Sequence, residues 1–220
     1  MVTEDHLRSW LGVREAARWH ETPAAAPAAA VHLPVRDGAV HDIRTFDRAH
    51  GADRADGLLA ALARARSDAS AGVPLTFDRL ASWQRHVLAT ADAPAFRTTA
   101  AFAKAGRERY GIAPDTRVRF DACLSQAADP GLPVAARAAR AYLDVCFFHP
   151  FADGNGRAAF LALEYVLAAA GVTLDQVGPV RRLQRAADDP ADALALANLV
   201  ASLIRHTHRR AARAAFASTH

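Results

Sequence analysis

The chain has 220 residues, of which 51% are hydrophobic and 23% are charged, and its 27 basic and 23 acidic side chains give a formal net charge of +4. These fractions exclude an intrinsically disordered protein and predict one hydrophobic core, with room for a small N-terminal appendage. The sequence contains no apolar run near the roughly 18 residues of a membrane-spanning helix, and its two cysteines are too few for a disulfide framework or a cysteine metal site.

The N-terminal part of the chain predicts a short helical appendage. Acidic residues and Trp10 occupy the place where a signal peptide would need basic and then apolar residues, so we expect a bacterial cytoplasmic protein. Residues 4–20 repeat their apolar side chains at helical spacing. Residues 22–34 are rich in proline and alanine, which predicts a linker. We therefore divide the chain into an N-terminal helix and linker over residues 1–35 and a helical domain over residues 36–220.

The next segment predicts a turn and two helices. Asp37 and Gly38 are typical of a turn between short apolar pieces. Residues 54–66 carry leucines at helical spacing, and Thr76 is suited to cap a further helix that begins after it.

The helical rhythm is interrupted once before the strongest helices begin. Residues 96–113 contain two short arms on either side of Gly106, which indicates a hairpin-like flap. Helical patterns then cover residues 115–124 and 134–148, and a nearly all-apolar helix over 155–170 is expected to lie buried at the centre.

The C-terminal residues 174–215 predict two more helices, interrupted near Pro179 and Pro190. The fold class is therefore all-α, with a small β-hairpin. Four arginines gather near the C-terminus, at positions 205, 209, 210 and 213. Acidic residues are interleaved with the arginines elsewhere, so the pattern favours a solvated last helix over a nucleic-acid surface.

The candidate chemistry lies in the turn between the two strongest helices, which reads HPFADGNGR over residues 149–157. Pro150 disfavours helical backbone at His149, so the first helix should end there and present an imidazole able to accept a proton. Asp153 is suited to hold Mg²⁺ beside a phosphate, and Asp153 or Asn155 can cap the second helix.

The phosphate itself is predicted to bind at the start of that second helix. Gly154, Asn155 and Gly156 leave backbone N–H groups uncovered there, which together with the helix dipole favours an anion. Arg157 adds a guanidinium fork for a second oxygen. Each residue alone is more often structural, but the set in this order indicates phosphoryl or nucleotidyl transfer.

The same nine residues resemble the signature of the Fic family, HPFx[DE]GNGRxxR, and in outline the resemblance extends from about residue 75 to residue 203. It implies a Fic-like helical bundle that transfers AMP from ATP, or a group from another nucleotide donor, to a hydroxyl of a protein target. By this resemblance His149 is the catalytic base and Asp153 the Mg²⁺ ligand. Residues 154–156 form the anion hole, and Arg157 is the first phosphate-binding arginine.

The resemblance also assigns two supporting roles. Phe151 would anchor the loop in the core, and residues 98–104 fall where the family has a flap that pairs with an extended target segment. Lys104 in that flap either meets substrate or is simply a solvated lysine.

The sequence departs from the signature at its last position, where Phe160 replaces the second arginine. A phenylalanine cannot bind an anion, so either the donor has no γ-phosphate, or it binds in another orientation, or activity is lost. None of the five glutamates follows a serine or threonine by four positions, so the family's inhibitory [ST]xxxE[GN] helix is not expected, while a separate antitoxin chain stays open. Glu164 is expected in a buried pair or at a polar rim.

The alternatives are therefore a Fic-fold transferase of another phospho-group, either Doc-like phosphorylation or phosphocholine-type transfer, and a catalytically inactive module that binds a nucleotide or partner. Against the Doc branch, Gly156 occupies the place of its usual lysine.

Overall fold

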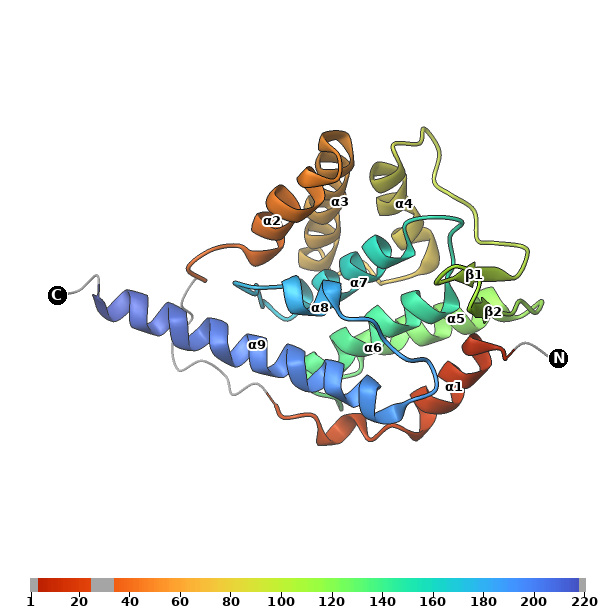
Figure 1. Ribbon diagram of the computed structural model, residues 1–220. Coiled ribbons are helices and arrows are strands. Elements are labelled where there is room, and N and C mark those ends of the chain that lie inside the picture. Colours follow the sequence, from red (N-terminus) through yellow and green to blue (C-terminus); the bar gives the residue numbers. More distant parts are fainter. Residues whose placement is uncertain (1–3, 25–33, 218–220) are drawn as a thin grey trace.

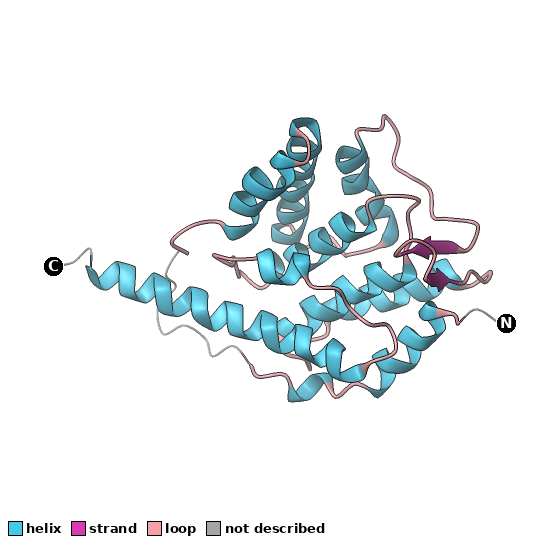
Figure 2. Cartoon of the chain, viewed as in Figure 1, coloured by secondary structure: helices cyan, strands magenta, loops and turns pink. Residues whose placement is uncertain are grey.

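A computed structural model describes residues 4–24 and 34–217, and it consists of helices with one small hairpin (Figures 1 and 2). This confirms the predicted all-α class with a hairpin. The linker predicted over 22–34 lies mostly outside the described residues, and the division at residues 35 and 36 stays a prediction.

Two helices form the centre of the molecule. They are α6 (Val134–Phe148) and α7 (Asn155–Ala169), which pack on each other more extensively than any other pair. Their bounds agree with the predicted ranges to within one residue. Nearly every residue of α7 is buried, which matches its apolar composition and leaves no face for water.

The remaining long helices surround this pair. On one side α3 (Ala52–Ser70) contacts both α7 and α4 (Phe77–Leu88), and on the other α9 (Pro190–Ala217) packs along α6 (Figure 1). The side chain of Thr76 accepts a hydrogen bond from the Arg79 N–H at 3.2 Å, so the predicted cap of α4 is confirmed. The smaller α5 (Thr116–Ser125) and the 3₁₀ turn η3 (Gln126–Ala128) lie against α6.

The N-terminal helix is part of this core. The predicted helix over 4–20 is α1 (His6–Ala16) followed by a separate 3₁₀ turn, η1 (Trp19–Glu21). Trp10 is fully buried, and its indole N–H donates to Asp144 on α6 at 3.0 Å. Arg14 joins the same carboxylate through Nε at 2.7 Å, so a buried charge pair ties α1 to α6.

The predicted flap is a two-stranded antiparallel hairpin, β1 (Ala101–Ala103) and β2 (Glu108–Tyr110). Phe102 on β1 is exposed, whereas Tyr110 on β2 is buried. The outer edge of β2 meets the N-terminal segment through a bridge between Asp5 and Arg109.

Two predictions about turn residues were wrong. Asp37 and Gly38 begin helix α2 (Gly38–Asp42), because the Asp37 carboxylate accepts the Val40 N–H at 3.1 Å; the π-helical turn η2 (Ile43–Asp47) continues it. The two predicted C-terminal helices are confirmed as α8 (Gly178–Arg182) and α9 (Pro190–Ala217), and the chain is interrupted directly before Pro190 as predicted, whereas Pro179 lies in the first turn of α8 and does not interrupt a helix. Proline fits the first helical turn because the N–H it lacks would have no intrahelical partner there.

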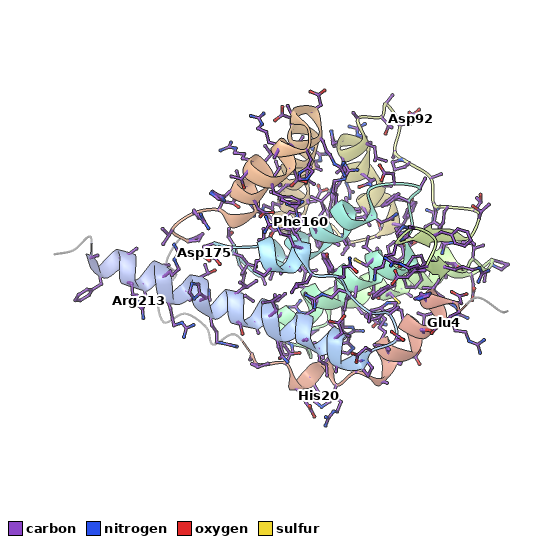
Figure 3. All side chains as sticks on the ribbon, viewed as in Figure 1. Glu4, His20, Asp92, Phe160, Asp175 and Arg213 are labelled. Atoms are coloured by element: carbon purple, nitrogen blue, oxygen red, sulfur yellow. The ribbon has the colours of Figure 1, made fainter. Side chains whose placement is uncertain are left out.

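Both cysteine thiols are free. Among the helices of residues 4–24 and 34–217, none has the length and apolar composition that crossing a bilayer requires. On α9, Arg210 pairs with the buried carboxylate of Asp175 at 3.1 Å, so this arginine of the C-terminal cluster has a structural partner (Figure 3 labels Asp175).

Candidate functional site

The loop that joins α6 to α7 contains the candidate residues, and its backbone bends sharply at two points. His149 ends α6 in the left-handed conformation (φ 50°), as expected for a residue that Pro150 keeps out of the helical region. Gly154 precedes α7 with φ 76°. This left-handed conformation favours glycine, and a Cβ at Gly154 would lie 2.4 Å from Gln84 Nε2, so that the end of the Gln84 side chain would have to shift.

The His149 imidazole is held in one tautomer. Its Nδ1 lies 3.2 Å from the Cys146 carbonyl oxygen, which can only accept, so Nδ1 carries the proton and Nε2 of the neutral ring has a free lone pair. Burial lowers the pKa of His149, which favours this neutral form near pH 7. The Tyr110 ring stacks on the imidazole at a centroid distance of 4.8 Å and an interplanar angle of 7°.

Tyr110 is a site residue that the sequence did not reveal. Its hydroxyl donates to Glu108 at 2.5 Å, and the Glu108 carboxylate pairs with Lys104 at 2.7 Å. Lys104, which the sequence left as a substrate contact or a solvated lysine, is thus half-buried and holds the flap together, also donating to the Arg185 carbonyl at 3.1 Å. The flap thereby holds the aromatic ring that covers His149.

Asn155 shapes the loop instead of capping α7. Its side chain accepts from the Phe151 N–H at 2.9 Å and donates to the Phe151 carbonyl at 2.8 Å. The cap position belongs to Gly154, which has no side chain, so the predicted capping by Asp153 or Asn155 was wrong. Phe151 is 1% exposed, consistent with the predicted anchoring role.

The first turn of α7 presents free backbone donors. Within the described part of the chain, the N–H groups of Asn155 and Gly156 have no acceptor, whereas those of Arg157 and Ala158 bond to the Gly154 carbonyl. Uncovered N–H groups at the start of a 15-residue helix favour an anion.

Arg157 and Asp153 lie beside these donors. The Arg157 side chain is 10% exposed, and it donates to the Val87 carbonyl at 3.1 Å and lies 3.4 Å from Asp153 Oδ2. Its Nε is buried without a partner among the described residues. Burial, and then the like charge of Arg54, lower the pKa of Arg157, although the guanidinium stays protonated.

Asp153 fits the way proteins bind Mg²⁺. Its carboxylate is 79% exposed, and its only contacts within the described residues are the Gly154 N–H at 2.6 Å and Arg157. No group of three or more histidine, cysteine or acidic residues within the described ranges forms a metal cage. Mg²⁺ commonly takes one or two carboxylates together with substrate phosphates and water, so a single accessible carboxylate beside an anion site suits it.

These residues face one cavity of about 460 Å³. It brings together His149, Asp153, Gly154, Asn155, Gly156 and Arg157 with other side chains, most of which come from elements that are distant in the sequence. The additional side chains are Phe46, Asp47, Arg54, Phe102, Tyr142 and Arg181. A larger cavity of about 780 Å³, bounded by residues such as Phe77, Phe96 and Arg117, contains none of the residues predicted to bind phosphate or Mg²⁺ or to accept the proton.

Phe160, at the position where the signature has its second arginine, is fully buried on α7 near the middle of the molecule (Figure 3). It does not line the cavity. The guanidinium of Arg181 lies over its ring, 4.6 Å from the centroid. Glu164, one turn further on, is buried and pairs at 2.6 Å with Arg66, which is half-buried, so of the two predicted environments the structure has the ion pair.

Comparisons with known proteins give one matching family and several solved structures with a similar fold. Residues 74–167 match the model of the Fic/DOC family. Among solved structures, a fragment of Fic-1 from C. elegans has a TM-score of 0.57 at 18% identity, over 97% of this chain and 72% of that one. A variant of the same fragment has a TM-score of 0.55 at 20% identity, with the same coverage.

A Fic domain-containing signaling protein from Bacteroides thetaiotaomicron has a TM-score of 0.56 at 19% identity, over 81% of this chain and 80% of that one. At these identities the structural likeness establishes the fold. A search of curated proteins found no match to this sequence.

Proposed function

The chain belongs to the Fic/DOC family through residues 74–167, and from this premise we propose that it transfers a nucleotidyl group of the AMP type from a nucleotide donor to a hydroxyl of a protein target. Membership of the family makes it a Fic-fold transferase of some kind. The identity of the transferred group, the donor and the acceptor are our proposal.

One observation carries the proposal: His149, with Nε2 unprotonated, faces the same cavity as the free N–H groups of Asn155 and Gly156. The hydroxyl of the target would give its proton to Nε2 while its oxygen forms a bond to the donor's α-phosphorus. The bond from that phosphorus to the bridging oxygen breaks, and pyrophosphate leaves when the donor is a nucleoside triphosphate. The imidazolium then holds one proton more than before.

The anion site would hold the donor during this step. Backbone N–H groups and Arg157 can bind phosphate oxygens whose charge changes during the reaction, which is where fixed donors are most effective. Asp153 would hold Mg²⁺ against the same phosphates. When bound, this ion supplies positive charge that neutralises the phosphate oxygens.

The flap supports a protein as the acceptor. Strand β2 is covered on its outer side by the N-terminal segment, whereas β1 pairs only with β2 among the described residues. An extended target segment can therefore add to β1, where Phe102 is 59% exposed beside the cavity.

The test is a donor screen with an intact-mass readout. The protein and candidate target proteins are incubated with Mg²⁺ and, separately, each of the four ribonucleoside triphosphates and a set of nucleoside-diphosphate-linked donors. We expect a mass increment with one donor that is lost in His149→Ala and kept in His20→Ala, an exposed histidine outside the cavity. An increment unaffected by His149→Ala would contradict the role of the imidazole.

The buried Phe160 favours a second candidate, a module that binds a nucleotide or a partner without transfer, or a transferase of another phospho-group. Calorimetry with the same donors separates the candidates. Tight binding of a nucleotide without any mass increment on any target supports the binding module. An increment with the mass of phosphate or of phosphocholine supports the other transferases.

A further inference from the structure

Three arginines from three different helices line the cavity that contains His149: Arg54 on α3, Arg157 on α7 and Arg181 on α8. Two aspartates, Asp47 and Asp153, line it as well. The arginines differ in what already binds them. That difference indicates which of them is free to hold a further phosphate.

Arg181 is fully engaged by protein groups. Its Nη1 lies 2.6 Å from Asp42 and 2.7 Å from Asp47, and its Nη2 lies 3.0 Å from Asp47. Its guanidinium also lies over the Phe160 ring, 4.6 Å from the centroid. A guanidinium that is 9% exposed and shared by two carboxylates has its charge neutralised where it lies. Arg181 therefore positions α8 against η2 and does not offer an anion site.

Arg54 has the opposite environment. It is exposed near the N-terminal end of α3 and, in the part of the chain that the structure describes, has neither an ion pair nor a hydrogen bond to its side chain. It faces the same cavity as Arg157, whose pKa its charge helps to lower. Two guanidinium groups that repel each other across a cavity are stabilised when an anion binds between them.

We propose that Arg54 is the second anion-binding arginine of this cavity, acting from α3 on the wall that it shares with Arg157 and the α7 N-terminus. Arg157 and the N–H groups of Asn155 and Gly156 would hold the first phosphate. The ligand class is a compound with two or more linked phosphates. This inference rests on the proposed function, because it assigns a part of the donor to the same cavity.

The test uses inorganic pyrophosphate with Mg²⁺ as the probe, measured by titration calorimetry on the full chain. Arg54→Ala is expected to weaken binding roughly tenfold, as the loss of one charge-assisted contact would. Arg48→Ala is the matched control, because it removes the same charge from a nearby exposed side chain that pairs with Asp56 outside the cavity. We expect less than a twofold change in that variant. Inorganic monophosphate should bind Arg54→Ala and wild type equally.

Each outcome decides the matter. Equal affinity of Arg54→Ala and wild type for pyrophosphate, or no binding by wild type, overturns the role of Arg54. Equal weakening by Arg54→Ala and Arg48→Ala also overturns it, since the effect is then one of overall charge. The donor screen described above separates this inference from the proposed function. If the screen finds no mass increment but pyrophosphate binding depends on Arg54, group transfer is refuted and the Arg54 subsite stands. If the screen finds a mass increment that Arg54→Ala does not change, transfer stands and the Arg54 subsite is refuted.

Discussion

The buried pair between α1 and α6 gives a sharp prediction about stability. Asp144 is 0% exposed and accepts hydrogen bonds from Trp10 Nε1 at 3.0 Å, Arg14 Nε at 2.7 Å and Arg14 Nη2 at 3.1 Å. Burial lowers the pKa of Arg14, but the charge and hydrogen bonds of Asp144 outweigh burial, so the pKa is raised overall. Asp144→Ala leaves a buried guanidinium without its carboxylate and an indole N–H without its acceptor.

Removing one partner of such a pair costs about 3–5 kcal/mol of the free energy of unfolding. For a chain of this length that corresponds to a fall in melting temperature of roughly 6–20 °C. Urea unfolding followed by far-UV circular dichroism measures the first quantity, and scanning calorimetry measures the second. The control is Asp56→Ala, whose pair with Arg48 is more than half exposed and should contribute less than about 1 kcal/mol.

A double variant separates the loss of the pair from general damage to the core. Replacing both partners with apolar residues, as in Arg14→Met with Asp144→Leu, removes the unpaired charge and should recover most of the loss. A loss below about 1 kcal/mol in Asp144→Ala would refute the buried pair. A double variant no more stable than Asp144→Ala would show that the loss comes from packing.

Three further predictions concern the site. Burial lowers the pKa of His149 from its ordinary value of 6.5, and the base must be neutral, so kcat/KM should fall only below that pH. Tyr110→Leu uncovers the imidazole ring and should move this acidic limb of the pH–rate profile to higher pH. A limb that does not shift would count against the role of the stacked tyrosine. Gly154→Ala should lower the free energy of unfolding in urea by about 1–3 kcal/mol and weaken pyrophosphate binding, because alanine is strained at a φ of 76° and its Cβ would displace the Gln84 side chain. Wild-type stability and wild-type binding would refute the strained loop. Phe160→Arg should destabilise the fold and fail to increase ATP binding in calorimetry, because the new charge would lie buried beneath Arg181. A variant that is as stable as wild type and binds ATP more tightly would disprove this.

Sequence reasoning located the centre of the fold well because local signals were strong there. Helices α6 and α7 are rich in apolar residues and are separated by a loop that contains Pro150 and Gly154, so both their extent and the loop between them follow from short-range rules. The signals at Pro179 and Pro190 were ambiguous, because proline both ends helices and begins them. Only the neighbouring contacts of α8 and α9 decide between the two.

The rest of the site could not be predicted because it comes from residues far apart in the sequence. Tyr110 reaches His149 from the flap, and Arg54 reaches Arg157 from α3, with separations of 39 and 103 residues. Neither position has a local pattern that distinguishes it from other tyrosines or arginines. A motif specifies the atoms that its own loop holds, and only the packing of the helices specifies what faces that loop.

The substitution at Phe160 has a different meaning in the sequence and in the structure. In the sequence, the resemblance to the Fic signature makes it a missing phosphate ligand. In the structure, the Arg181 guanidinium lies over its ring, while Asp42 and Asp47 accept hydrogen bonds from the Nη atoms of the same guanidinium. An arginine at position 160 would repel Arg181, so the aromatic ring and the two aspartates form one arrangement that depends on all its members. Restoring a phosphate ligand therefore requires a charge elsewhere on the cavity wall, and Arg54 is the side chain in the described residues that meets this requirement without disturbing that arrangement.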